Sequence, residues 1–282
     1  MNANRLTVGL LLGTAAVTGC SDRTPMASSH APPRPSFMTG GQIDAGHPYV
    51  GAIIFDTPSP SFFPVAYRPW YCSGTLVSRR VVQTAAHCLA FAALDGGFEP
   101  NGLPPSLIHV SFAQNVTDPN SWRKVSGYVY HPSFVAPFST FDVALIILQA
   151  PENDVPLGAL PAAGYLDGFK NAELKAFSYA DVGYGMVGPE EGFALTGDRR
   201  VATVGFKKVD ADVLSLDRQP GGACFGDSGG PILLQSGGVE YVVAAVHGGI
   251  GQDCTSSSFT AQRLDLTSVL DFIQSTITSH GP

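Results

Sequence analysis

Residues 226–231 read Gly-Asp-Ser-Gly-Gly-Pro and place a single serine, Ser228, among glycines. Glycine leaves little bulk beside the hydroxyl and permits backbone angles that turn several N–H groups toward one point. A serine that attacks an amide carbonyl needs both an open approach and N–H donors for the developing oxyanion. The stretch therefore predicts a nucleophilic Ser228, with the backbone N–H groups of Gly226 and Ser228 as the oxyanion donors.

A serine nucleophile also needs a base, and the best candidate is His87. Residues 84–88 read Thr-Ala-Ala-His-Cys. The small alanines would let a strand end pack closely while the imidazole projects into a cleft. A lone histidine is more often structural or exposed, but these flanks favour a functional one.

An aspartate is expected to orient that imidazole, and Asp142 opens the apolar run Val143–Leu148. A carboxylate at such a position is expected to be partly buried, and a buried carboxylate needs partners. Pairing with the far nitrogen of a histidine supplies one partner and fixes the tautomer of the ring. The alternative is a turn residue that starts a strand, because this segment alone is weakly specific.

The composition favours a turn-rich β protein. Only 14% of the 282 residues are charged, while Gly (32) and Pro (22) are abundant, and the net charge of -7 gives no electrostatic footprint for nucleic acid. Short apolar runs separated by turn residues predict strands at 49–55, 74–77, 81–84, 107–112, 143–148, 174–179, 201–206, 231–234 and 239–246. Residues 266–277 instead repeat apolar side chains every three to four positions, which predicts an amphipathic helix.

The order His87, Asp142, Ser228, with these flanks and paired cysteines, resembles the chymotrypsin/trypsin family of serine proteases. The resemblance runs from Met38 to the C-terminal helix. It implies an all-β fold of two antiparallel six-stranded β-barrels with a C-terminal α-helix. The first barrel would span about 38–150, the second about 151–264 and the helix about 266–279. Residues 182–185, Val-Gly-Tyr-Gly, resemble a strand that opens the second barrel.

The same resemblance implies a serine endopeptidase that works through an acyl-enzyme, with His87, Asp142 and Ser228 as catalytic residues. It implies protein or peptide substrates, a monomer, no cofactor and no metal. The remaining histidines lack metal-ligand spacing, and there is no His-Glu-x-x-His motif. Two family disulfides match the pairs Cys72–Cys88 and Cys224–Cys254.

The chain departs from the family in the residues that shape the specificity pocket. The position that governs specificity in the family holds Gly222, followed by Ala223, and glycine offers no charge for a basic substrate residue. We therefore expect an apolar or small residue before the cut. Relatives have Ser-Trp-Gly where this chain has Val-His-Gly-Gly at 246–249, so either Val246 or His247 replaces a serine that helps to hold the catalytic aspartate. His247 and Gly248 are candidate substrate contacts, and a solvent-facing loop is the equal alternative for His247.

The N-terminus predicts export. Residues 1–19 resemble a lipoprotein signal peptide, with an apolar run too short to span a bilayer. Cys20 follows a small residue and would carry the lipid that anchors the protein to the bacterial outer membrane or cell surface. Residues 20–37 are rich in Pro and Ser and predict a tether. A plain signal peptide with an incidental cysteine is the alternative.

Activation is expected to differ as well. In the family, cleavage frees an Ile or Val whose ammonium pairs with the aspartate before the nucleophile, here Asp227. The matching residue of this chain is Met38, so a cut after Phe37 would also release the domain from its anchor. The atypical Met38 and the altered pocket favour an alternative hypothesis. In it, the chain is a lipoprotein with a protease fold that binds a partner and is catalytically weak or inactive. An esterase is a third reading, because the same acyl-transfer chemistry cleaves esters.

Overall fold

The computed structural model describes Met1 and residues 41–61, 63–91, 103–135, 140–188, 192–218, 221–251 and 254–281. The predicted signal peptide beyond Met1, the lipidation site Cys20, the tether and the cleavage point before Met38 lie outside these residues. The fold below concerns the compact unit that begins at Arg34, as far as it is described.

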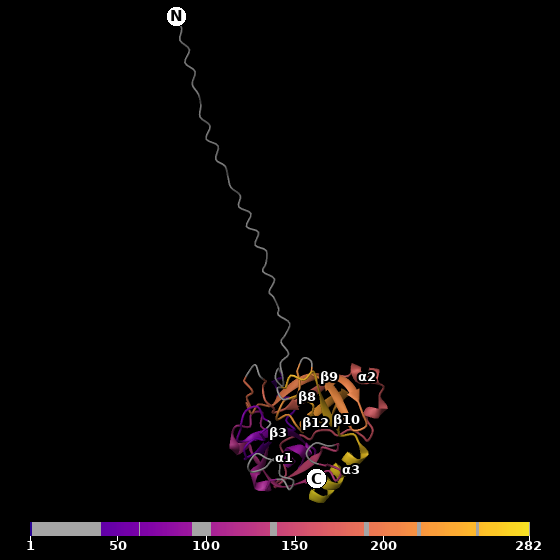
Figure 1. Cartoon of the computed structure of the whole chain (residues 1–282). Coiled ribbons are helices and arrows are strands. Elements are labelled where there is room, and N and C mark those ends of the chain that lie inside the picture. Colours follow the sequence, from indigo (N-terminus) through magenta and orange to yellow (C-terminus); the bar gives the residue numbers. More distant parts are fainter. Residues whose placement is uncertain are drawn as a thin grey trace. The chain divides into compact units, whose positions relative to one another are not determined.

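The first barrel closes from six antiparallel strands in the order β2-β3-β4-β7-β6-β5. Of these strands, Figure 1 labels β3. Their bounds are β2 Val50–Phe55, β3 Trp70–Leu76, β4 Val81–Thr84, β5 Ile108–Ser111, β6 Arg123–Tyr130 and β7 Ala144–Leu148. β4 has the predicted bounds. A long segment separates β2 from β3, which begins at Trp70.

The second barrel is built from the strands β8 to β13. Their bounds are β8 Tyr179–Gly183, β9 Arg200–Val209, β10 Val213–Asp217, β11 Pro231–Ser236, β12 Val239–Gly248 and β13 Ser258–Arg263. The order β9-β10-β13-β12-β11-β8 closes through the pairing of β8 with β9. The short strand β1, Gln42–Ile43, pairs with β9. The predicted fold of two antiparallel six-stranded barrels is confirmed.

Apolar residues fill both barrels and the space between them, and β2 contributes to both regions. Ile53 and Phe55 belong to the core inside the first barrel, while the alternate residues Ala52 and Ile54 belong to a cluster that also holds Val182 of β8. Successive strand side chains point to opposite faces, so one fully buried strand joins the two barrels through an apolar interface.

The helices are few. α1 is Ala86–Phe91, α2 is Asn171–Ala176 and α3 is Thr267–His280, with single 3₁₀ turns at Pro105–Leu107, Pro119–Ser121 and Leu166–Gly168. α3 confirms the predicted C-terminal helix. It buries Val269 and Ile273 and packs against β4 and β7 of the first barrel, although it follows the second barrel in the chain.

One predicted strand, 174–179, is wrong. Residues 171–176 form α2, and a strand starts only at Tyr179. The Glu173 carboxylate accepts a 2.7 Å hydrogen bond from the backbone N–H of Lys170, which satisfies a donor that a helix start otherwise leaves unpaired. This local capping outweighs the apolar pattern around Leu174.

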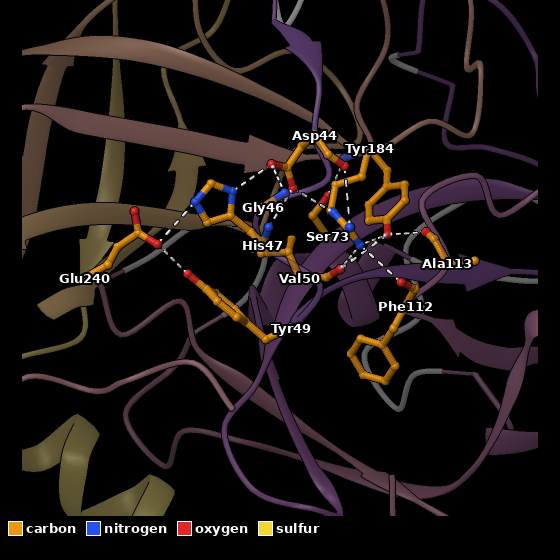
Figure 2. A network of polar contacts seen from close by, with 11 residues as sticks. Asp44, Gly46, His47, Tyr49, Val50, Ser73, Phe112, Ala113, Tyr184 and Glu240 are labelled. Carbon is orange, nitrogen blue, oxygen red and sulfur yellow. Dashed lines mark hydrogen bonds and ion pairs between the residues drawn. The ribbon is translucent and has the colours of Figure 1, made fainter. Parts of the chain in front are cut away.

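A polar network ties the N-terminal segment to both barrels (Figure 2). Asp44 accepts hydrogen bonds from His47 Nδ1 (2.8 Å) and from Arg199 Nε (2.8 Å). The other ring nitrogen of His47 lies 3.1 Å from Glu240 Oε2, which also accepts the Tyr49 hydroxyl at 2.7 Å. The segment after residue 41 is therefore held by charged groups from β12 and from the residue that precedes β9.

Candidate active site

Ser228 lies in the turn-rich segment between β10 and β11. Gly226 and Gly229 have φ angles of 98° and 79°, which a residue with a Cβ rarely adopts. A Cβ at Gly229 would lie 2.3 Å from Thr84 Oγ1 and 2.4 Å from the backbone nitrogen of Ala85. The glycines thus allow the serine loop to approach the end of β4, immediately before the segment that carries His87.

His87 lies in the first turn of α1 rather than at a strand end, because β4 stops at Thr84. Ala85 and Ala86 are completely buried, as expected from their small size. The disulfide Cys72–Cys88 joins β3 to α1 next to the imidazole. The histidine is therefore fixed by covalent and packing contacts on both sides.

Asp142 is completely buried between β6 and β7 and faces His87. Its Oδ2 lies 2.6 Å from His87 Nδ1, and its Oδ1 accepts a 2.7 Å hydrogen bond from the backbone N–H of His87. The preceding Phe141 has a φ of 58°, and its ring stacks on His131 with centroids 4.7 Å apart. This stacking supports an uncommon backbone conformation directly before the carboxylate.

A second histidine contacts the same carboxylate oxygen. His247 Nδ1 lies 2.6 Å from Asp142 Oδ2. His247 is in β12, and its side chain is 19% exposed. The sequence alternative in which His247 faces solvent from a loop is therefore wrong. Burial alone would raise the pKa of Asp142, but the charge and hydrogen bonds of His87 and His247 hold it below its usual value. Asp142 is therefore a carboxylate at neutral pH.

A cavity of about 340 Å³ opens beside these groups. His87 and Ser228 both line it, and so does His247. The other lining residues are Phe225, Val246, Gly248, Gly249, Ile250, Gly251 and Thr260. The described lining does not include Gly222 or Ala223; a Cβ on Gly222 would instead lie 3.1 Å from the ring of Phe259.

Comparison with known proteins agrees with this geometry. Residues 46–177 match the sequence profile of the family described as Trypsin. This stretch is just under half of the chain, and it is similar to the Trypsin family. The matched residues include His87 and Asp142, while Ser228 lies beyond them.

Several characterised serine proteases resemble the chain over part of their length. Serine protease Hayan of Drosophila melanogaster is 24% identical over 268 residues, which cover 84% of this chain and 38% of that protein. Venom serine protease Bi-VSP of Bombus ignitus is 24% identical over 250 residues, covering 79% of this chain and 63% of that protein. Trypsin of Saccharopolyspora erythraea is 30% identical over 123 residues, 42% and 45% of the two chains. The chain thus spans less than two thirds of each of these relatives.

The second expected disulfide, Cys224–Cys254, is also formed. The buried guanidinium of Arg218 donates hydrogen bonds to the carbonyl oxygens of Ala223 and Cys254, on the two sides of this bridge. Sequence reasoning missed Arg218, because nothing in its neighbourhood marks it as buried. Disulfides form in oxidising compartments, which indicates that the domain is exported. Among the described residues, no helix is both long and apolar enough to cross a membrane.

Asp227, next to the serine, is completely buried. Its carboxylate accepts hydrogen bonds from the backbone N–H groups of Gly185 (2.7 Å) and Cys224 (2.9 Å). A second buried carboxyl, Asp181 in β8, interacts electrostatically with it, and neither Asp181 oxygen has a hydrogen-bond partner among the described residues. Burial raises the pKa of both groups, that of Asp227 to about 7, although its two backbone hydrogen bonds and the nearby charge of Arg218 oppose the rise.

Proposed function

We propose that the domain is a serine endopeptidase, with Ser228 as nucleophile, His87 as general base and acid, and Asp142 as the group that orients His87. One observation carries this proposal. His87 touches Asp142 through Nδ1 at 2.6 Å and lines the same cavity as Ser228. These two facts support an imidazole that links a carboxylate to a serine, as amide hydrolysis by a serine nucleophile requires.

The geometry supports a definite proton path. A proton on His87 Nδ1 points to Asp142, which leaves Nε2 as the nitrogen that accepts the proton of Ser228 Oγ during attack. The imidazolium that forms is stabilised by the ionised Asp142. His87 then gives the proton to the leaving amine, an acyl-enzyme remains on Ser228, and water hydrolyses it. The N–H groups of Gly226 and Ser228 would stabilise the oxyanion.

Substrate preference follows from the cavity. None of its described lining residues is acidic, and Phe225, Val246 and Ile250 give it an apolar wall. A basic side chain would find no partner charge there, so we propose that the enzyme cleaves after an apolar or small residue. Gly248 and Gly249 add little bulk to the wall, which leaves room for the substrate backbone.

Anchoring and activation remain part of the proposal, and the sequence supports them. Lipid on Cys20 would hold the protein at the membrane through the tether, and cleavage before Met38 would release it and supply an ammonium for Asp227. The enclosed position of Asp227 supports this step, because a buried carboxylate near a second carboxyl gains from a positive partner. N-terminal sequencing of active material tests it: an active form that begins at Cys20 would contradict release by cleavage.

The catalytic proposal is tested with a fluorophosphonate probe and a peptide library. We expect the probe to label Ser228 and the enzyme to cleave library peptides. Ser228→Ala should lose labelling and at least about 10⁴-fold in kcat. Ser236→Ala at the end of β11 is the matched control and should retain both. A protein that folds but neither reacts nor cleaves would instead be the binding lipoprotein of the alternative hypothesis.

A further inference from the structure

We propose that His87, Asp142 and His247 form an inhibitory binding site for a zinc-like divalent transition-metal ion. Binding of the ion is independent of the proposed function, while the inhibition rests on it. Two imidazoles and one carboxylate belong to the ligand set that proteins use for zinc with a fourth position open. The three residues are far apart in sequence, so ligand spacing along the chain gives no sign of the site.

The three donors are already close together. One ligand atom from each residue lies within 4.8 Å of the other two. Both Nδ1 atoms lie 2.6 Å from Asp142 Oδ2. Ligand atoms around a tetrahedral zinc with bonds of about 2.0 to 2.1 Å are about 3.3 to 3.5 Å apart. Each nitrogen–oxygen contact must therefore open by roughly 1 Å, a shift within the range of small side-chain rotations.

An ion can reach these donors from the cavity. His87 and His247 line the space of about 340 Å³, and the His247 side chain is partly exposed. Asp142 Oδ2 lies within 2.6 Å of both imidazole Nδ1 atoms, so an ion that reaches the histidines also reaches the carboxyl oxygen. A cation thus enters from the solvent side and meets a buried carboxyl group that contacts two imidazoles.

The residue that completes this ligand set is His247. A serine at the same place supplies only a hydroxyl, which is a weak ligand for a borderline-soft ion such as Zn²⁺. An imidazole nitrogen is a preferred ligand. His247 thus both contacts Asp142 and supplies the third metal donor.

Occupancy would stop catalysis for a definite reason. A neutral imidazole that binds an ion through Nδ1 carries its proton on Nε2. His87 then has no lone pair with which to accept the Ser228 proton, and its hydrogen bond to Asp142 is replaced by the metal bond. Because the cavity stays open to substrate, inhibition should lower kcat much more than it raises KM.

Binding is measured first, without reference to turnover. Full-length Ser228→Ala protein is titrated with ZnCl₂ by calorimetry and with CoCl₂ by visible absorption. We expect a site that gives the intense absorption bands of low-coordinate Co²⁺ and that Zn²⁺ displaces. Adding His247→Asn should weaken this site more than about tenfold, while adding His109→Ser, a control histidine in β5, should not. Equal affinity with and without His247, or no such site, overturns the proposal.

Activity is measured second. Zn²⁺ should inhibit the wild-type enzyme, and a chelator should restore activity, while Mg²⁺ should have no effect because it prefers oxygen ligands. The His247→Asn carboxamide can still donate a hydrogen bond to Asp142 but is a poor zinc ligand, so whatever activity it retains should resist Zn²⁺. Wild-type activity that resists saturating Zn²⁺, although the ion binds Ser228→Ala, overturns the inhibitory role. Absence of protease activity in every form contradicts the proposed function and leaves the binding result intact.

Discussion

Arg199 donates a 2.8 Å hydrogen bond from Nε to Asp44 Oδ2, and both side chains are 3% exposed. The same guanidinium reaches the carbonyl oxygens of Val50 (3.3 Å) and Phe112 (3.1 Å). One guanidinium therefore pairs with the Asp44 carboxylate and donates hydrogen bonds to a carbonyl oxygen of β2 and to that of the residue after β5.

Loss of either partner should destabilise the domain. Arg199→Met leaves Asp44 as a buried charge with only His47 beside it, and we expect a loss of about 3 to 5 kcal/mol in the free energy of unfolding. The double variant Asp44→Leu/Arg199→Met removes both charges and should be less destabilised than Arg199→Met. Urea unfolding measures this, and a double variant equal to the sum of its single variants would contradict direct pairing.

Gly229 should not tolerate alanine. Its φ of 79° is unfavourable for a residue with a Cβ, and the added atom would collide with Thr84 and with the backbone of Ala85. We expect Gly229→Ala to cost about 2 to 4 kcal/mol from backbone strain and overpacking. It should also move Ser228 and lower kcat.

Gly237 offers a matched control for this change. It has a φ of 59°, and a Cβ there would meet nothing within 4 Å. Gly237→Ala should therefore show the strain alone, about 1 kcal/mol, with unchanged kcat. Equal stability and activity of the two variants would show that the close approach of the serine loop to β4 is not a constraint.

The disulfide Cys72–Cys88 should stabilise both the barrel and the site. It closes a loop of 16 residues beside His87, for which chain entropy predicts about 3 kcal/mol. The double variant Cys72→Ala/Cys88→Ala should lower the melting temperature and reduce kcat, because α1 loses its covalent tie to β3. Unchanged kcat in the folded variant would show that packing of Ala85 and Ala86 suffices to place His87.

Local patterns predicted the parts of the fold that depend on nearby residues. The run at 81–84 gave β4 with its bounds, and the three-to-four residue spacing gave α3. The sequence analysis does not predict β10, Val213–Asp217, although it alternates buried with partly exposed residues and its Leu214 and Leu216 are fully buried. β10 is defined by its pairing with β9 and β13, which a single sequence does not reveal.

The residues of the candidate site also fall into those that a local motif indicates and those whose role depends on distant neighbours. Motifs around His87 and Ser228 are contiguous, so the sequence indicated them directly. Asp181 is different, because its significance comes from a buried neighbour, Asp227, that lies on another segment. His247 had two equal interpretations until its contact with Asp142, 105 residues earlier, was known.

The carboxyl pair of Asp181 and Asp227 predicts a pH dependence of stability with a definite sign. Burial raises the pKa of Asp227 to about 7 and raises that of Asp181 as well, while carboxyl groups in the unfolded chain titrate near 4. Between about pH 4 and pH 7 the folded state therefore binds more protons than the unfolded state. The free energy of unfolding contributed by this pair must fall as the pH rises through that range.

Other charged groups also affect the pH dependence of stability, so one pH profile does not isolate the contribution of the carboxyl pair. Arg218 and Arg200 are the cations whose charge lowers the pKa of Asp227. His47 lies elsewhere in the domain and has a raised pKa, so it also makes the free energy of unfolding fall as the pH rises. The informative quantity is therefore the difference between wild type and Asp181→Asn, measured by urea unfolding from pH 4.5 to 7.5. The amide does not titrate, so it removes the contribution of the raised Asp181 pKa and should flatten the decline.

The same measurement on protein cleaved before Met38 tests the activation proposal. An ammonium beside Asp227 favours the carboxylate form and lowers its pKa, so the decline between pH 4.5 and 7.5 should also be flatter in the cleaved form. Uncleaved wild type should keep the full decline. If cleaved and uncleaved proteins show the same slope while Asp181→Asn differs from both, the new N-terminus does not reach Asp227.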